Sequence, residues 1–270
     1  MAQRTYAVTG VASGIGAELA RNLTQRGDHV IGLDIRETSA NLARFIPLDL
    51  DDPDSITLAA AQITEPLDGL CNNAGLPPRD GLEQAILQVN FLGTRAFTQA
   101  VLPALRSGAS IVNIASRAGQ GWREGAGQVK RLAALTRRDQ LARFIEVEKL
   151  DATRCYNLTK EAMILWTLAE AEPMVQRGLR MNTVSPGGIA TRILDDFQKA
   201  FGAPMVRNVE RAGRIGKPEE IAAVATFLLS PESFWIKGTD IVTDGGMSAF
   251  NLADALDLQR LRMSPLGTAP

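Results

Sequence analysis

The stretch that decides the fold class of this 270-residue chain is residues 5–34, TYAVTGVASGIGAELARNLTQRGDHVIGLD. An apolar run at residues 5–9 is followed by a glycine-rich turn at 10–16 and a helical pattern at 17–26. A second apolar run follows at 29–34. A strand, a helix and a strand in this order predict a βαβ unit, which usually belongs to a parallel sheet.

The same alternation continues along the rest of the chain. It predicts a single doubly wound, Rossmann-type α/β domain with a parallel sheet of about seven strands flanked by helices. We expect this domain to span residues 1–250 and a C-terminal extension to span 251–270. The further strands are expected at residues 45–48, 67–71, 111–115, 181–184 and 240–242, and the further helices at 56–63, 82–105, 156–175 and 219–229.

The composition argues against several classes of function. A net charge of −1, from 29 basic and 30 acidic residues without a long run of one sign, favours a small-molecule ligand over nucleic acid or a membrane surface. No apolar stretch has the length of a bilayer span or of a signal-peptide core. Two cysteines, Cys71 and Cys155, are too few for a disulfide framework, so we expect a cytoplasmic protein. The single histidine, His29, argues against a metal site or a histidine-based triad.

The glycine-rich turn, TGVASGIG at residues 9–16, follows a strand and opens a helix. This context suits a dinucleotide pyrophosphate, because glycines permit close backbone approach and the helix N-terminus offers free N–H groups. Asp34 ends the second strand, where a carboxylate can accept hydrogen bonds from an adenosine ribose and repel a 2′-phosphate. The sequence therefore favours NAD over NADP. Arg36 is the counter-argument, because an arginine there can accommodate a 2′-phosphate.

Tyr156 and Lys160 lie four residues apart in an apolar-periodic segment, so one face of a helix carries both. Together with the glycine turn and several motifs in a fixed order, they make residues 5–246 resemble the short-chain dehydrogenases/reductases. The matching motifs are the turn at 9–16, Asp49 at the end of the third strand, NNAG at 72–75, Asn90 in VNFLG, Ser116 after IVNIA, the Tyr156/Lys160 pair, and SPGG at 185–188 through Thr191.

The resemblance implies an NAD-dependent alcohol dehydrogenase or carbonyl reductase. By that resemblance Tyr156 is the acid/base, Lys160 stabilises its phenolate, Ser116 hydrogen-bonds the substrate oxygen, and Asn90 holds a water of the proton relay. The implied cofactor-binding residues are Gly10, Ser13, Gly14, Ile15, Gly16, Asp34, Asp49, Leu50, Asn73, Ala74, Gly75, Tyr156, Lys160, Pro186, Gly187, Ile189 and Thr191. The alternative from another class is an NAD-binding regulatory protein without turnover, but it would be expected to lack one of Ser116, Tyr156 and Lys160.

The chain departs from the family pattern between Ser116 and Tyr156, where an insertion at residues 117–153 precedes the catalytic tyrosine. A comparable insertion marks a subgroup that includes 3α-hydroxysteroid dehydrogenase/carbonyl reductase and coniferyl alcohol dehydrogenase. Trp122, Cys155 and Trp166 make the chain look closer to the coniferyl alcohol type. The insertion is expected either to border the substrate cleft or to be a packed helical hairpin that covers neighbouring helices.

Such an insertion is expected to block one subunit interface, which favours a homodimer, with a tetramer as the alternative. The substrate is expected to be a bulky apolar or aromatic alcohol or carbonyl compound. The candidates for an apolar pocket wall, each of which has a core position as its alternative, are Trp122, Leu194, Phe197, Phe201 and Met205.

Overall fold

A computed structural model of the chain describes residues 3–38, 40–190 and 194–263. Its centre is a seven-stranded sheet in the order β3-β2-β1-β4-β5-β6-β7, and every pair of neighbouring strands is parallel. This order confirms the doubly wound, Rossmann-type class predicted from the sequence. The strands are β1 (Thr5–Thr9), β2 (His29–Asp34), β3 (Arg44–Pro47), β4 (Leu67–Asn72), β5 (Leu105–Ile114), β6 (Arg180–Pro186) and β7 (Asp240–Thr243).

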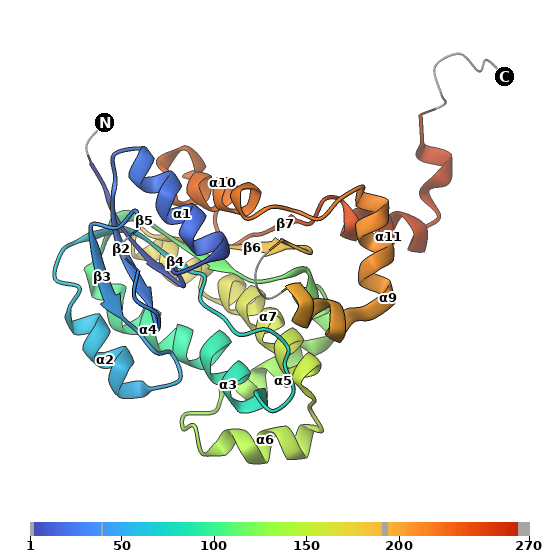
Figure 1. The fold of residues 1–270 in the computed structure, drawn as a ribbon, viewed down its shortest axis with the longest axis horizontal. Helices are drawn as coiled ribbons and strands as arrows, with labels where there is room; N and C mark the ends of the chain where they lie inside the picture. Colours follow the sequence, from blue (N-terminus) through green and yellow to red (C-terminus); the bar gives the residue numbers. More distant parts are fainter. Residues whose placement is uncertain (1–2, 39, 191–193, 264–270) are drawn as a thin grey trace.

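Helices cover both faces of the sheet (Figure 1). On one face lie α1 (Gly14–Gln25) and α10 (Pro218–Leu229), and on the other lie α2 (Pro53–Ala61), α4 (Thr94–Val101) and α7 (Ala152–Ala169). Successive side chains of a strand point to opposite faces, so Tyr6 and Val8 join the core under α1 and α10, whereas Ala7 joins the core under α2 and α4. Both cores consist of apolar side chains that are almost completely buried.

The single helix expected at residues 82–105 is wrong, because the structure divides it. α3 (Glu83–Leu87) leads into a π-helical segment, η1 (Gln88–Gly93), and then into α4 and a short 3₁₀ turn (Leu102–Ala104). The Thr94 hydroxyl donates to the Val89 carbonyl, five residues back, and the Asn90 amide is held by the backbone of Leu76. These contacts accompany the π-helical segment, whose wider turn interrupts the α-helical pattern at this point.

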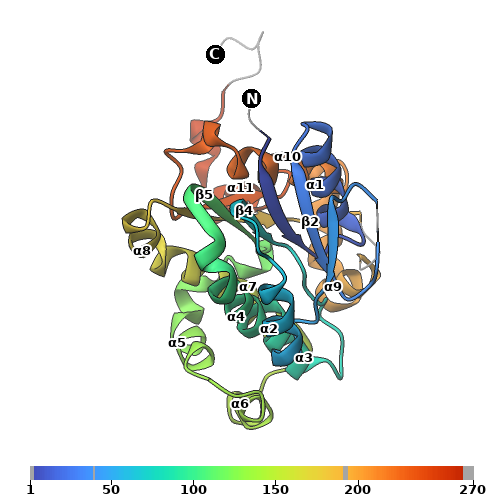
Figure 2. The same ribbon diagram turned by 90° about the vertical axis from the view of Figure 1, so that its left-hand side faces the viewer.

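The insertion forms two helices, α5 (Trp122–Ala133) and α6 (Gln140–Glu148), of which α5 packs against α7. Figure 2 shows α5 and α6 beyond the α4 and α7 layer, on the side away from α1 and α10. Apolar side chains of the insertion face inward, since Leu132, Leu141 and Phe144 are buried. Gly125 allows the close approach of α5 to α7, because a Cβ there would overlap the buried Glu161 carboxylate.

α7 begins at Ala152, four residues before Tyr156, where the Asp151 carboxylate accepts a hydrogen bond from the Arg154 amide. The helix expected at 156–175 thus starts four residues earlier than predicted. Its last part forms a separate short helix, α8 (Ala171–Gln176). The sequence patterns did not predict α9 (Leu194–Ala212), which contains a non-helical residue at Gly202 and a proline at 204.

The expected boundary at residue 250 falls inside α11 (Met247–Ala255), and a 3₁₀ turn (Leu258–Leu261) follows this helix. Figure 1 shows that this end of the chain extends away from the sheet. Within the described residues, no helix has both the length and the apolar character that crossing a membrane requires.

Candidate active site

A cavity of about 700 Å³ opens at the carboxyl ends of the strands. It runs past β1 and β4, where the strand order reverses, which is the usual ligand position in open α/β sheets. Most predicted site residues line it, although they come from segments far apart in the chain. Those residues are Gly10, Ser13, Gly14, Ile15, Asp34, Asp49, Leu50, Asn73, Ala74, Gly75, Ser116, Tyr156, Lys160, Pro186, Gly187 and Ile189.

The backbone of the glycine turn lines one end of this cavity. Gly10 and Gly14 have φ angles of 74° and 58°, a region that favours glycine, and the Gly10 amide donates to the Leu33 carbonyl at 2.7 Å. α1 then starts at Gly14, so its free N–H groups face an anion-binding position. Gly16 is not among the lining residues; a Cβ there would overlap the Gly10 carbonyl, so this glycine allows the helix to pack on the turn.

Asp34 lies beside the glycine turn at the end of β2. Its carboxylate accepts hydrogen bonds from the amides of Ala12 at 3.0 Å and Arg36 at 2.9 Å, and the residue is buried. The half-exposed Arg36 guanidinium donates to the Ser13 hydroxyl at 3.1 Å and lies 4.0 Å from the Asp34 carboxylate. The carboxylate and the guanidinium are therefore neighbours at the same end of the cavity.

The NNAG segment connects the sheet to the glycine turn. Asn72 donates to Thr98 and to Asn113, which joins β4 to α4 and β5. Asn73 donates to the carbonyl oxygens of Thr9 at 3.0 Å and Gly10 at 3.1 Å. The segment thereby fixes the backbone on which the cavity is built.

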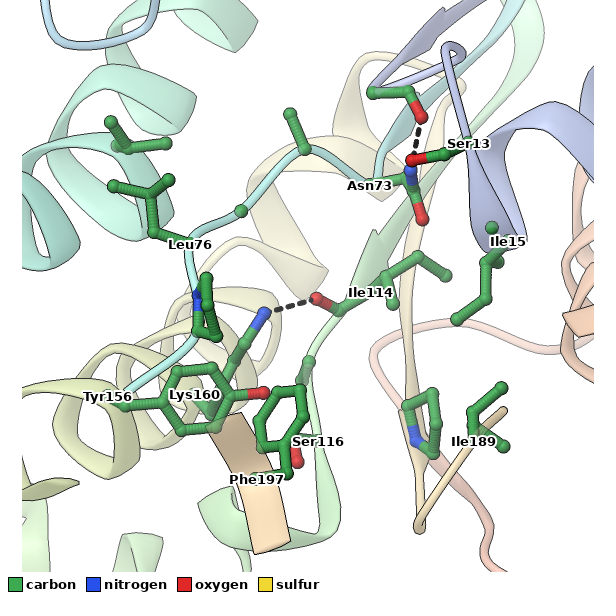
Figure 3. A pocket seen from close by; sticks show the side chains of 18 of the residues that line it. Ser13, Ile15, Asn73, Leu76, Ile114, Ser116, Tyr156, Lys160, Ile189 and Phe197 are labelled. Atoms are coloured by element: carbon green, nitrogen blue, oxygen red, sulfur yellow. Dashed lines mark hydrogen bonds between the residues drawn. The ribbon is translucent and has the colours of Figure 1, made fainter. Parts of the chain in front are cut away.

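Ser116, Tyr156 and Lys160 meet at the other end of the cavity (Figure 3). Burial raises the pKa of Tyr156 above its ordinary value, and its hydrogen bond with the Ser116 side chain acts in the opposite direction. The Lys160 ammonium donates to the Ile114 carbonyl at 3.0 Å and lies 5.5 Å from the centre of the Tyr156 ring. Because Lys160 is fully buried, its pKa falls from 10.5 to about 8.

Asn90 is buried just behind this group, in the π-helical segment. Its side chain accepts from the Leu76 amide at 2.7 Å and donates to the Leu76 carbonyl at 2.9 Å. It is not among the residues that line the cavity. Gly75 stands between Asn90 and Lys160, since a Cβ there would lie 3.3 Å from the Asn90 Oδ1 and 3.8 Å from the Lys160 Nζ. The relay water thus stays a prediction.

The predicted nicotinamide seat has Pro186, Gly187 and Ile189 on the cavity wall, and Ile189 forms a bridge with Gly216. Thr191, the last residue assigned to this seat, lies outside the described residues.

An aromatic wall from α9 faces Tyr156. The Phe197 ring meets the Tyr156 ring edge-on with centroids 5.3 Å apart, and Phe197 and Phe201 stack with an interplanar angle of 10°. Both line the cavity together with Met205, so these three pocket predictions agree with the structure. Aromatic rings attract one another in edge-on and stacked arrangements, so a planar aromatic ligand can pack against this wall.

Trp122 is not on the wall, which corrects its assignment to the pocket. It starts α5 and packs within the apolar cluster around α7. Leu194 was the fifth pocket candidate, and its side chain is not described. Sequence reasoning missed Leu76, Arg79 and Met247, which also line the cavity, because no family motif or periodic pattern marks them.

Comparisons with known proteins agree with this geometry. Residues 4–127 match the short chain dehydrogenase family model, and residues 142–248 match the model described as enoyl-(acyl carrier protein) reductase. A coniferyl-alcohol dehydrogenase of Pseudomonas sp. is 37% identical over 253 residues, which cover 92% of this chain and 98% of that protein. The chain belongs to the short-chain dehydrogenase/reductase family.

Two further members of the family are similar across nearly their whole length. A 3-alpha-hydroxysteroid dehydrogenase/carbonyl reductase of Comamonas testosteroni is 28% identical over 250 residues, covering 90% of this chain and 95% of that protein. The crystal structure of a 3-alpha-hydroxysteroid dehydrogenase from Pseudomonas sp. B-0831 complexed with NADH has a TM-score of 0.79 and 29% identity. The match covers 92% of this chain and 98% of that one. The two family models leave residues 128–141 unmatched, and this gap lies inside the insertion.

Short-chain dehydrogenases/reductases use NAD or NADP, and the cavity has the groups that such a cofactor requires. A helix N-terminus with free N–H groups, the Asp34 carboxylate and the end of β6 at Pro186 and Gly187 all lie on its wall, and these are the kinds of group that a dinucleotide's pyrophosphate, ribose and nicotinamide would need. Among the side chains that the structure describes, no group of three or more His, Cys, Asp or Glu could hold a metal ion.

Proposed function

We propose that this member of the family is an NAD(H)-dependent alcohol dehydrogenase/carbonyl reductase that acts on a bulky aromatic alcohol or carbonyl compound similar to coniferyl alcohol. The observation that carries the proposal is the position of Tyr156, whose hydroxyl meets the Ser116 side chain and whose ring meets the Phe197 ring edge-on. Proton-transfer groups and an aromatic wall thus share one cavity.

For the cofactor we propose NAD, because the Asp34 carboxylate faces the ribose end of the cavity and would repel a 2′-phosphate. Arg36 argues in the other direction, but its guanidinium is already bonded to Ser13 and lies beside Asp34. A comparison of kcat/KM with NAD and NADP tests this choice, and a clear advantage of NADP would contradict it.

The chain's own residues hold and move the proton. Nicotinamide, when bound, accepts or supplies the hydride. Because burial raises the pKa of Tyr156, the phenol is the resting form, and in carbonyl reduction its hydroxyl protonates the substrate oxygen while the Ser116 hydroxyl orients that oxygen.

In alcohol oxidation Tyr156 must instead accept the proton. Lys160 has a pKa of about 8, so it is still mainly an ammonium at neutral pH and favours the phenolate electrostatically. Asn90 is proposed to act behind Lys160 through a water, which links the lysine to solvent.

The second candidate is a 3α-hydroxysteroid dehydrogenase/carbonyl reductase. It is favoured by the solved 3-alpha-hydroxysteroid dehydrogenase with a TM-score of 0.79. The stacked pair Phe197 and Phe201 favours a planar aromatic ring over the puckered rings of a steroid. A third alternative, an NAD-binding regulatory protein without turnover, conflicts with the presence of Ser116, Tyr156 and Lys160 in one cavity.

The substrate test follows NADH formation by absorbance with coniferyl and cinnamyl alcohols in one series and androsterone-like steroids in the other. We expect kcat/KM to be highest for an aromatic alcohol. Faster oxidation of the steroids would move the assignment to the second candidate, and no turnover in either series would contradict the proposed substrate class.

For the assembly we propose a cytoplasmic homodimer. α5 covers one face of α7, so a second copy cannot pack on that face as it would in a protein without the insertion. Light scattering distinguishes a homodimer from a homotetramer. A clean tetramer would contradict the proposal that α5 prevents a second copy from packing on α7.

A further inference from the structure

The insertion reaches the adenosine end of the cavity through one residue, Arg138, which lies between α5 and α6. Its guanidinium makes two parallel hydrogen bonds with the Asp51 carboxylate, at 3.0 Å from Nε to Oδ1 and 2.6 Å from Nη2 to Oδ2. Asp51 lines the cavity next to Asp49 and Leu50, two of the cofactor-binding residues that the family resemblance implies. The contact joins positions 87 residues apart in the chain.

We propose that Arg138 is a positioning residue for the adenosine half of the dinucleotide, so that the insertion supports cofactor binding. This inference rests on the cofactor site of the proposed function. It does not depend on which alcohol is the substrate.

The segment from Asp49 to Asp51 is held on its other sides by its own neighbours. The Asp49 amide donates to the Ser55 hydroxyl, and the Asp49 carboxylate accepts from the Asp51 amide, both at 2.9 Å. The Leu50 carbonyl lies so close to Gly93 that a Cβ on Gly93 would overlap it. The insertion holds this segment through the Asp51 side chain. The ion pair between Arg138 and Asp51 therefore helps to fix the direction of the Asp49 and Leu50 backbone.

Arg138 is presented by an ordered turn. The Gln140 side-chain oxygen accepts hydrogen bonds from the amides of Thr136 and Arg137, both at 3.0 Å. At the end of α5, Arg95 of α4 donates to the Ala133 carbonyl at 3.0 Å. Figure 1 shows the loop between α5 and α6 passing the segment between β3 and α2. The arginine therefore comes from a fixed position.

The expected size of the effect follows from exposure. The side chains of Arg138 and Asp51 are 48% and 30% exposed, so water weakens their attraction, whereas the two-bond geometry strengthens it. Loss of the pair should weaken adenosine binding by about two- to fivefold, the range of a partly exposed ion pair.

The test compares Arg138→Ala with the matched control Arg137→Ala in the full chain. Arg137 pairs with Asp139 inside the same loop, so its removal takes away the same charge without touching Asp51. Titration calorimetry with NADH and with ADP-ribose should give a Kd raised by about two- to fivefold for Arg138→Ala and an unchanged Kd for Arg137→Ala. The KM for NAD should rise with the Kd, whereas kcat at saturating NAD should not fall.

A second variant, Asp51→Asn, should weaken binding of both ligands by a similar factor. Combined with Arg138→Ala, it should add no further loss, because the two side chains act as one pair. Equal Kd values for Arg138→Ala and the unmodified chain, an equal loss in Arg137→Ala, or additive losses in the double variant would each overturn the inference.

The two proposals fail separately in this design. A chain that binds NADH but oxidises no alcohol contradicts the proposed substrate while the Kd comparison still decides the role of Arg138. A chain that binds neither NADH nor ADP-ribose contradicts both.

Discussion

Lys160 should lower the stability of the folded chain at neutral pH, and replacing it with methionine should reveal this through the pH dependence of unfolding. The ammonium is fully buried, and burial lowers its pKa from 10.5 to about 8. Methionine has a similar length and no charge, so the variant fills the site without the titrating group. It should also be inactive, because Tyr156 loses the cation beside it.

The sign of the effect follows from proton binding. Below pH 8 the folded and unfolded chains both carry the proton, and the full cost of the buried charge is present. Between pH 8 and 10.5 the folded chain has released it while the unfolded chain still binds it, so stability rises with pH. At about 1.4 kcal/mol per pKa unit the full change is about 3.5 kcal/mol, of which about 2 kcal/mol is recovered between pH 7 and 9.5.

Urea unfolding of the unmodified chain and of Lys160→Met at pH 7 and pH 9.5 measures this change. The free energy of unfolding of the unmodified chain should rise by about 2 kcal/mol relative to the variant over that interval. The variant also leaves the Ile114 carbonyl without its donor, which shifts the difference by a similar amount at both pH values. A difference that is the same at both pH values would refute the buried-charge reasoning.

Three further predictions concern packing, cofactor and substrate. Gly125→Ala should destabilise the fold by about 1–3 kcal/mol in urea unfolding, because its methyl group would overlap the Glu161 carboxylate. In the matched control Gly127→Ala on the same helix, the added methyl group would make only an ordinary contact with the Arg131 side chain, at 3.7 Å, so this variant should be neutral or stabilising, and equal losses in both variants would contradict the packing argument. Asp34→Ala should lower the ratio of kcat/KM for NAD to that for NADP, and an unchanged ratio would remove Asp34 from the ribose site. Phe197→Ala should raise the KM for coniferyl alcohol by about tenfold, the scale of one lost aromatic contact, and an unchanged KM would remove Phe197 from the substrate site.

The sheet and the cofactor end of the cavity could be predicted from the sequence because their signals are local. The βαβ pattern, the glycines with positive φ at 10 and 14, and Asp34 at a strand end each depend on residues close together in the chain. Ser116 and Tyr156 were found by motif, and the structure brings them to the same cavity end although the insertion separates them in sequence.

The remaining features depend on contacts between distant segments. The break in the helix at 82–105 lies where Asn90 bonds to the backbone of Leu76, a contact that no periodicity shows. Helix α9, which carries the aromatic wall, was not predicted because Gly202 and Pro204 interrupt its helical pattern. Trp122 was a candidate for the pocket wall with a core position as its alternative, and it packs in the apolar cluster around α7, a contact between segments that no local pattern shows.

The most direct test of the central claim compares NADH formation from coniferyl alcohol by the unmodified chain and by Tyr156→Phe, which keeps the ring against Phe197 and removes only the hydroxyl. The unmodified chain should turn over, and the variant should bind NADH with the same Kd but keep at most a few per cent of the activity, since general acid/base catalysis contributes about 10²–10⁴-fold. Turnover by Tyr156→Phe at a rate close to that of the unmodified chain would contradict the assignment of Tyr156 as the group that moves the proton.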